Sequence, residues 1–383
     1  MASSPRALPS VFMSVSLRPQ PVRPSAAPTI FGVIGVVLLG LLLLCVLAYV
    51  VVRLGVNAAA VCTGVALIPL AVVLLGVRWI DRWDPESPLG LWFAFLWGAG
   101  GAAVIVLLIE LNMKITAVVL GDYPGYSNFV GAVIRAPLVE ETAKGVGVLL
   151  VLMIWRRTVD GPVDGIVYAA VVASGFACVE NILYFGRGYV EDGLYGLVGI
   201  FFLRGVLSPF AHVLFTSCTG VALGVASRRS PDVRVPIALL GLALAVFLHA
   251  LWNGSSFLMS DWFGFYLVVQ VPLFALAVVG VILLRRRERR VTLERLADYA
   301  AVGWFSPDEV RMLGTPKGRR TAIHWARSFG GSYPTVMRGL MRSATRLAHL
   351  RQRQLLGRAG RDTALEERRL LDDVVARRAV FTR

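Results

Sequence analysis

The chain is 383 residues long, and its composition is that of a membrane protein: 56% of the residues are hydrophobic, 16% are charged, and the mean hydropathy is +0.69. A soluble domain carries roughly 25% charged residues, so this composition excludes an ordinary soluble globular protein. The four cysteines lie in apolar stretches without a Cys-x-x-Cys pair, so the sequence suggests neither a disulfide framework nor a zinc knuckle. The net charge of +15 is concentrated in residues 285–383, which carry 23 Lys and Arg against 10 Asp and Glu.

The N-terminal residues 1–28 are rich in Pro and Ser and are predicted to be disordered. After them, apolar runs recur that are as long as a helix must be to cross a bilayer. We therefore expect an all-α, polytopic membrane helix bundle of about eight transmembrane helices, with residues 29–285 as its functional core. The predicted spans are 30–53, 57–78, 89–112, 130–155, 163–185, 207–228, 235–253 and 262–284.

The placement of arginine predicts the orientation of these spans. With eight spans, the loops after the second, fourth and sixth spans share one side with the run from Arg285 to Arg290, and each of these segments carries two or more arginines. The opposite loops carry little positive charge. By the positive-inside rule, we expect a multi-pass cell-membrane protein with both termini in the cytoplasm.

The segment 193–209 is apolar enough to be embedded in the membrane, but it contains Arg204, Gly205 and Pro209. We interpret it as a re-entrant or interfacial segment on the outer side. The alternative is a ninth span, which would place the C-terminal tail on the other side of the membrane.

Residues 286–383 are predicted to form a basic, cytoplasmic, helical tail. The sequence Ser306-Pro307-Asp308-Glu309 is typical of a helix start, and apolar residues recur at helical spacing between 334 and 356. The tail has no recognisable nucleic-acid-binding motif, so we expect its charge to face anionic lipid rather than nucleic acid. The sequence predicts no oligomeric state.

The predicted fourth span contains a group of charges, Glu140-Glu141-Thr142-Ala143-Lys144. A charge at the centre of a bilayer costs about 2.5–3.5 kcal/mol on insertion scales and usually faces a partner or a water-filled cavity. Lys144 is at helical spacing from both carboxylates and can pair with either one. The other carboxylate is then left to take a proton from water. The alternative is a buried ion pair that only fixes helix packing, but one Glu would be enough for that.

Other spans contain Glu180, His212, His249 and Asn253, and His249 and Asn253 share one helical face. Each of these alone is explained equally well as an interhelical hydrogen-bonding residue. Their predicted depth argues for a shared site, because Glu140 lies about 15 Å and Glu180 about 8 Å below the outer surface, with both histidines within about two turns of that surface. Carboxylates and imidazoles in one layer supply the base, donors and acceptors that hydrolysis by an activated water requires.

Several of these residues fall into motifs that follow one another along residues 79–285. The motifs are Glu-Glu-x-x-Lys at Glu140, Glu141 and Lys144; Asp-Gly-x-x-Tyr at Asp164, Gly165 and Tyr168; Gly-Phe-x-x-x-Glu-Asn at Gly175, Phe176, Glu180 and Asn181; a His after an Arg/Pro segment at Arg204, Pro209 and His212; and a His with Asn four residues later at His249 and Asn253. In this order the motifs resemble the PrsW family of intramembrane proteases, within the CAAX-protease and bacteriocin-processing superfamily. The cytosolic loop 81–86 also resembles that family, although Glu86-Ser87-Pro88 stands where Glu-Pro is usual.

The resemblance implies hydrolysis of peptide bonds in a membrane-anchored protein. In the best-known members the substrate is a single-span anti-sigma factor that is cut on its extracytoplasmic side. Together with the predicted layer, the resemblance gives the expected site. The catalytic candidates are Glu140, Glu141, Glu180, His212, His249 and Asn253, and the supporting residues are Lys144, Asn181 and Arg204.

Two hydrolytic mechanisms fit these residues. Without a metal, Glu140 or Glu141 activates water, while His212, His249 and Asn253 orient it and stabilise the oxyanion. With a metal, the two histidines and a carboxylate hold zinc, and another Glu is the base.

Glu180 is the expected third zinc ligand in the metal-dependent scheme. The PrsW family is often labelled a metalloprotease. However, these ligands come from separate helices and no His-Glu-x-x-His motif is present, so we favour the metal-free scheme.

A different class of function is also open. Intramembrane Glu, His and Lys mark proton relays, so a proton-coupled transporter or channel is the alternative. The sequence shows no inverted repeat of the kind that many transporters contain.

Overall fold

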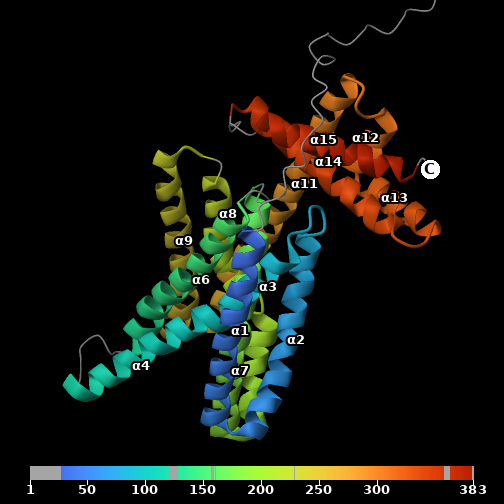
Figure 1. Ribbon diagram of the computed structural model, residues 1–383. Helices are drawn as coiled ribbons and strands as arrows, with labels where there is room; N and C mark the ends of the chain where they lie inside the picture. The colour runs from blue at the N-terminus through green and yellow to red at the C-terminus, as the bar shows by residue number, and fades with distance from the viewer. Residues whose placement is uncertain are drawn as a thin grey trace, which may run out of the picture.

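The computed structural model describes residues 27–120, 128–156, 159, 161–227, 229–357 and 363–381. Regular structure in these residues is helical, which confirms the predicted all-α bundle (Figure 1). The predicted disordered segment 1–28 lies outside the described residues, except that Ala27 and Pro28 begin the first helix.

The helices of the bundle, with η for π-helical turns, are α1 (Ala27–Leu54), α2 (Val56–Ile80), α3 (Pro88–Leu96), η2 (Trp97–Ala102), α4 (Ala103–Leu120), α5 (Asn128–Val130), η4 (Gly131–Arg135), α6 (Ala136–Ile154), α7 (Pro162–Phe201), η5 (Phe202–Leu207), α8 (Ala211–Ala226), α9 (Pro231–Leu258), α10 (Trp262–Phe265), η6 (Tyr266–Gln270) and α11 (Val271–Ala301).

The described residues contain six continuous helical segments that are long and apolar enough to cross a membrane. One of them, 162–226, contains both α7 and α8, and α6 is a further long helix that carries three charged residues. Each of the eight predicted spans therefore has a helical counterpart. The six segments are 27–54, 56–80, 88–119, 162–226, 231–258 and 262–301.

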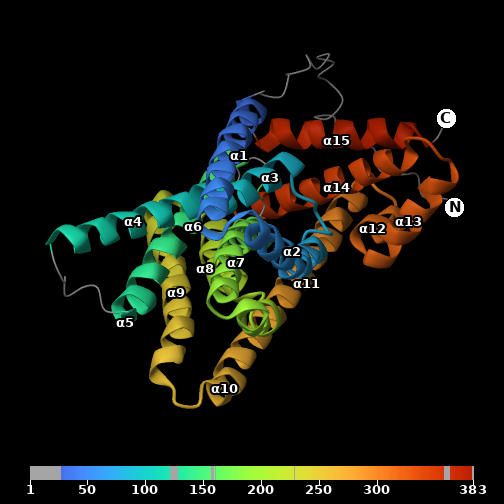
Figure 2. The ribbon, with the colours of Figure 1, turned by 90° about the horizontal axis from the view of Figure 1, so that it is seen from below.

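Helix α7 is the centre of the bundle and packs against α2, α3, α6 and α8. Glycines allow the backbones to approach closely, since a Cβ at Gly165 would lie 2.1 Å from the carbonyl oxygen of Gly220 in α8. A Cβ at Gly98 in η2 would lie 1.9 Å from the carbonyl oxygen of Val172 in α7. Close backbone approach at small residues is typical of helix packing in membranes, where lipid tails provide no hydrophobic force between helices. In contrast, Figures 1 and 2 show α4 running outward from the bundle.

The chain reverses direction at Asp192 and Gly193, where φ of Gly193 is +59° and the backbone is not helical. The following segment folds back along α7, because Gly188 and Gly196 are in backbone contact across the turn. It ends in η5, beside the middle of α7, and α8 then continues in the same direction. The segment 193–209 is thus the second arm of a helical hairpin, and we call it the re-entrant arm; its position relative to the membrane stays a prediction.

The C-terminal helices are α12 (Pro307–Gly314), α13 (Pro316–Ser328), α14 (Tyr333–Leu355) and α15 (Thr363–Ala379). They share a hydrophobic cluster with Leu296 and Tyr299 near the end of α11. The expected helix start is confirmed, since Ser306 and Glu309 form a reciprocal capping box before α12. Helix α11 runs without a break through the predicted boundary at residue 285.

The C-terminal helices are joined to the α2–α3 loop through Trp83 and Arg319. The guanidinium of Arg319 donates to the carbonyl oxygen of Trp83 at 2.6 Å and lies 3.6 Å from the centre of its ring. The indole N–H of Trp83 donates to Thr292 in α11 at 3.3 Å. Figure 1 shows α12–α15 gathered at this end of the bundle.

Candidate active site

Side chains from α6, α7, η5, α8 and α9 meet in one buried cluster inside the bundle. Glu140, Glu141 and Lys144 come from α6, which presents them on the face toward α7, α8 and α9 because they lie three and four residues apart. His212 is in the first turn of α8, and His249 lies late in α9. The rings of the two histidines are 5.2 Å apart between centroids. The structure therefore brings together residues that the sequence places more than 100 positions apart.

The Lys144 ammonium lies at the centre of the cluster and has no solvent exposure. It donates to Glu140 Oε2 at 3.2 Å, to Glu141 Oε1 at 2.9 Å and to His212 Nδ1 at 3.0 Å. These three bonds use all three N–H groups of the ammonium. The ring of Phe176 covers it at 4.1 Å from the ring centroid.

The two adjacent carboxylates differ in their surroundings. Glu141 accepts hydrogen bonds from Lys144, from the hydroxyl of Thr216 at 2.8 Å and from His249 Nδ1 at 3.0 Å. Glu140 is bonded to Lys144 through Oε2, and that oxygen lies 4.0 Å from His249 Nε2. Glu141 is thus held by three donors from three helices, whereas Glu140 keeps capacity to bind water.

The donors fix the hydrogen positions on both imidazoles. An ammonium can only donate, so Nδ1 of His212 accepts from Lys144, and Nε2 of His212 donates to Glu180 Oε2 at 2.7 Å. An ionised carboxylate can only accept, so Nδ1 of His249 donates to Glu141. Nε2 of His249 is therefore the imidazole nitrogen with a lone pair directed toward Glu140.

Glu180 and Asn181 in α7 are bound by Arg204 from the re-entrant arm. The Arg204 guanidinium donates to Glu180 Oε2 at 2.5 Å and to Asn181 Oδ1 at 2.8 Å, and it stacks on Tyr184 at 4.2 Å. Arg204 thereby fixes the end of the re-entrant arm against α7 and neutralises the Glu180 carboxylate.

Asn253 has a different setting from the one expected. Its side-chain amide donates to the carbonyl oxygen of Ala132 in η4 at 2.8 Å. This bond joins α9 to the segment that precedes α6. A related bond, from the indole of Trp97 to the carbonyl oxygen of Ala143 at 2.9 Å, joins η2 to α6. Both bonds position the backbone that carries the cluster.

The Asp-Gly-x-x-Tyr motif and the loop before α3 form a second polar group at the other end of α7. The hydroxyl of Tyr168 donates to Glu86 Oε2 at 2.9 Å, and Asp164 accepts from the backbone N–H of Gly161 at 3.0 Å. Burial, with Asp164 close by, raises the pKa of Glu86 well above its usual value. This group ties the loop between α2 and α3 to the start of α7 and lies apart from the Glu140 cluster.

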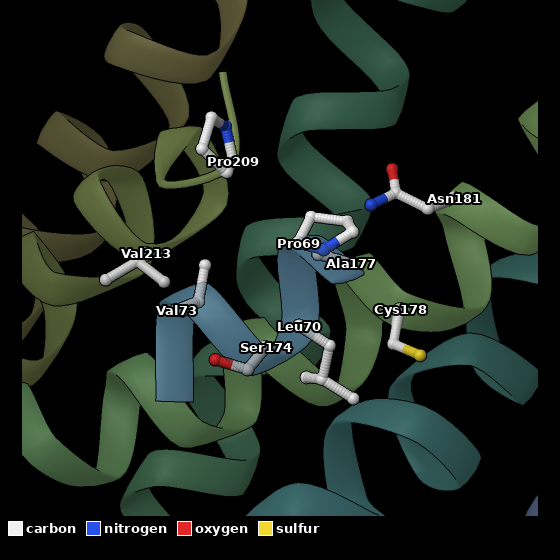
Figure 3. A pocket seen from close by; sticks show the side chains of 9 residues that line it. All are labelled: Pro69, Leu70, Val73, Ser174, Ala177, Cys178, Asn181, Pro209 and Val213. Atoms are coloured by element: carbon white, nitrogen blue, oxygen red, sulfur yellow. The ribbon is translucent and has the colours of Figure 1, made fainter. Parts of the chain in front are cut away.

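Two small hollows adjoin the cluster. The first lies between α2, α7 and α8 and is drawn in Figure 3. The second shares Ala177, Asn181 and Pro209 with it and reaches Arg204 and His212. Space next to the cluster is therefore bordered by both apolar and polar side chains. The first hollow is lined by Pro69, Leu70, Val73, Ser174, Ala177, Cys178, Asn181, Pro209 and Val213.

Sequence reasoning missed three residues of the cluster. Thr216 binds Glu141, Phe215 stacks on His249 at 5.0 Å between centroids, and Tyr184 stacks on Arg204. The available signal was helical spacing, because Phe215 and Thr216 lie three and four residues after His212. Uncharged side chains are common in apolar spans, so their residue type alone does not indicate a site.

Comparison with known proteins identifies the family. A family model described as "PrsW family intramembrane metalloprotease" matches residues 86–277, half of the chain. The chain belongs to the PrsW family. It is 29% identical to Protease PrsW of Clostridioides difficile over 209 residues, which cover 54% of this chain and 83% of that relative. It is also 29% identical to Protease PrsW of Bacillus subtilis over 169 residues, which cover 44% and 73%. No solved structure matches.

As a PrsW protein, the chain is an intramembrane protease, a peptidase that acts on protein substrates in the membrane. This membership favours the protease over the transporter alternative. The match of residues 86–277 includes every residue of the Glu140 cluster and stops before the C-terminal helices.

The PrsW family description names a metalloprotease, and three residues have suitable donor atoms. Glu140, His212 and His249 each offer one ligand atom, and these atoms lie within 4.8 Å of one another. The set differs from the expected His212, His249 and Glu180, since Glu180 is bound by Arg204. However, the Lys144 ammonium already binds Glu140 and His212 from within this set. The donor types fit zinc, but the arrangement of the side chains does not.

Proposed function

We propose that this protein hydrolyses peptide bonds of membrane-anchored proteins by a metal-free mechanism in which Glu140 is the general base. The observation that carries this proposal is the unequal bonding of the two carboxylates. Glu141 accepts hydrogen bonds from Lys144, Thr216 and His249, whereas Glu140 accepts one from Lys144 alone. A base must be able to bind water, and Glu140 meets that requirement.

The balance of charge supports the same choice. The cluster contains three carboxylates and two permanent cations. Arg204 is paired with Glu180 at 2.5 Å, and the shortest contact of Lys144 with a carboxylate is the 2.9 Å bond to Glu141. The negative charge of Glu140 is therefore the least neutralised by a neighbouring cation, which makes Glu140 the strongest proton acceptor of the three carboxylates.

The proposed reaction begins with a water molecule bound between Glu140 and Nε2 of His249. Both groups accept hydrogen bonds, so the water donates its two protons to them and directs a lone pair at the peptide carbonyl carbon. Glu140 takes the proton as the C–O bond forms, and the protonated Glu140 then gives that proton to the leaving amine. The positive charges of Lys144 and Arg204 favour the negative charge that develops on the carbonyl oxygen.

In this proposal the remaining candidates position these groups. Glu180 orients His212, Asn181 and Arg204 hold the re-entrant arm, and Asn253 joins α9 to η4. Each of them determines where Glu140 and His249 lie relative to a substrate.

We further propose that the substrate is an anti-sigma factor or a similar single-span protein, cut near its extracytoplasmic end. Glu180 lies about 27 Å along α7 from Pro162 and about 18 Å from the turn at Asp192, so the cluster is in the half of the bundle away from the C-terminal helices. The arginine-rich C-terminal segments favour the cytoplasm for the other end, with both termini there. This orientation would put the cluster toward the extracytoplasmic face.

The test compares cells that produce the wild-type protein, Glu140→Gln or Glu191→Gln, an exposed control carboxylate. New N-termini of membrane proteins are mapped by mass spectrometry in each strain. We expect fragments cut near extracytoplasmic ends of single spans in the wild type and in Glu191→Gln, with a loss of about 100-fold or more in Glu140→Gln. Unchanged fragments in a Glu140→Gln protein that accumulates normally would disprove the assignment of the base.

A further inference from the structure

The Lys144 ammonium lies inside the group of donor atoms that would otherwise suit a metal ion. We propose that Lys144 is the resident cation of this site, and that zinc binds to Glu140, His212 and His249 only when Lys144 is replaced. The inference rests on the proposed function for its catalytic meaning, since it concerns the same site.

The first argument is the direction of one lone pair. Nδ1 of His212 accepts a hydrogen bond from Lys144 Nζ at 3.0 Å, so its lone pair points at the ammonium. A zinc ion on that nitrogen would lie along the same direction at roughly 2.0–2.1 Å, and hence about 1 Å from Nζ. The two cations cannot be present together.

The second argument concerns the other nitrogen of His212. Nε2 is 2.7 Å from Glu180 Oε2 and 3.4 Å from the Arg204 guanidinium. A zinc ion there would have to replace the proton that joins His212 to Glu180, and it would lie beside a second permanent cation. Neither nitrogen of His212 is therefore open to a metal while Lys144 is in place.

The third argument is that the contacts of the Lys144 ammonium match those expected of a metal ion at this position. Its ammonium has no solvent exposure and uses its three N–H groups on Glu140, Glu141 and His212. The Phe176 ring, whose face is electron-rich, also lies against the ammonium, with its centroid 4.1 Å from Nζ. A monovalent cation built into the chain thus makes the contacts that a metal ion would make with Glu140 and His212.

Removal of the ammonium reverses these conditions. Lys144→Ala deletes one positive charge between two carboxylates, frees the lone pair of His212 Nδ1 and opens the volume of a lysine side chain. Glu140, His212 and His249 would then face that space as one carboxylate and two imidazoles, a ligand set that zinc accepts with water in the fourth position.

The experiment measures bound zinc in the purified full-length protein after dialysis against buffered zinc. We compare the wild type, Lys144→Ala, Lys144→Arg, and the double variant Lys144→Ala/His249→Ala. We expect about one zinc per chain in Lys144→Ala alone, and well below one in the other three. Cobalt(II), which gives strong visible absorption at tetrahedral sites, provides an independent spectrum of the same site. Lys144→Ser is the second small variant if Lys144→Ala does not accumulate.

Two results would overturn the inference. One is a wild-type protein that holds about one zinc per chain. The other is a folded Lys144→Ala or Lys144→Ser protein that binds no zinc. The metal content is read without a substrate, so it is separate from the proposed proteolysis. A metal-free wild type whose Glu140→Gln variant still cleaves would disprove the proposed function and leave this inference intact.

Discussion

Thr216 donates its hydroxyl to Glu141 at 2.8 Å, and both side chains are fully buried in the bundle. Glu141 also binds Lys144 and His249, so this carboxylate connects α6, α8 and α9. The bond between Thr216 and Glu141 is therefore expected to stabilise the arrangement of the Glu140 cluster without taking part in the proposed reaction.

Thr216→Val tests this expectation. Valine keeps the shape of threonine and removes the hydroxyl, so the variant should lose about 1.5–3 kcal/mol, the usual value of a hydrogen bond to a charged group. Thr219→Val is the matched control, because the Thr219 hydroxyl is buried without a hydrogen-bond partner in the described part of the chain. Thermal unfolding in detergent should show a lower midpoint for Thr216→Val and an unchanged or higher one for Thr219→Val. Equal midpoints would contradict the structural role of the bond.

The contact between α7 and α8 predicts a steric effect. Gly165→Ala would place a methyl group 2.1 Å from the Gly220 carbonyl oxygen, so the helices must separate at a cost of about 1–3 kcal/mol. The same change at Gly40 in α1 meets no atom within 4 Å and should be neutral or slightly stabilising. Unfolding midpoints of the two variants test the packing. A stable Gly165→Ala protein would mean that α7 and α8 are further apart than described.

The contacts of Arg319 are expected to hold the C-terminal helices against the α2–α3 loop. Its guanidinium binds Trp83, the Leu313 carbonyl oxygen at 2.7 Å and Thr345 at 2.5 Å. Arg319→Met removes these charged hydrogen bonds, each worth about 1.5–3 kcal/mol, so the helices should detach at least about tenfold more often. Limited proteolysis of the α2–α3 loop and of α12–α15 should be correspondingly faster. Arg320→Met, at an exposed neighbouring position, should cleave at the wild-type rate.

Asp81 predicts a pH dependence of stability. Burial raises the pKa of Asp81 to about 7 from an ordinary 3.8, despite the hydrogen bond from the Glu86 backbone and the nearby Arg342. The folded protein therefore holds a proton that the unfolded chain releases, and stability falls as the pH rises from about 4 to about 7. The unfolding midpoint should be higher at pH 5 than at pH 8. Asp81→Asn should reduce this slope, and the exposed control Asp308→Asn should retain it.

The sequence alone predicted those site residues whose charge is energetically costly inside a membrane. Glu140, Glu141 and Lys144 were identifiable because their spacing is helical and their charge is out of place in an apolar span. His212 and His249 could be assigned to the site only because they were predicted to lie at a similar depth in the membrane. The folded structure was needed to distinguish Glu140 from Glu141, because the difference depends on Thr216 and His249, which come from other helices.

Other features depended on the path of the chain. The partner of Glu180 is Arg204, which could be assigned only once the segment 193–209 was known to fold back along α7. The Asp-Gly-x-x-Tyr motif sits with Glu86 at the opposite end of α7, and sequence order gives no information on that distance. Asn253 shares a helical face with His249, but its amide finds a backbone partner in η4 instead.

Helix α11 touches both ends of the molecule. At its start, the hydroxyl of Tyr266 in η6 donates to the Leu207 carbonyl oxygen at 2.8 Å, three residues beyond the arginine that holds Glu180. At its far end the same unbroken helix, about 46 Å long over its 31 residues, is part of the C-terminal helical unit, where Thr292 accepts the indole proton of Trp83. One continuous helical segment, η6 with α11, therefore bonds to the arm that carries Arg204 at one end and to the α2–α3 loop at the other.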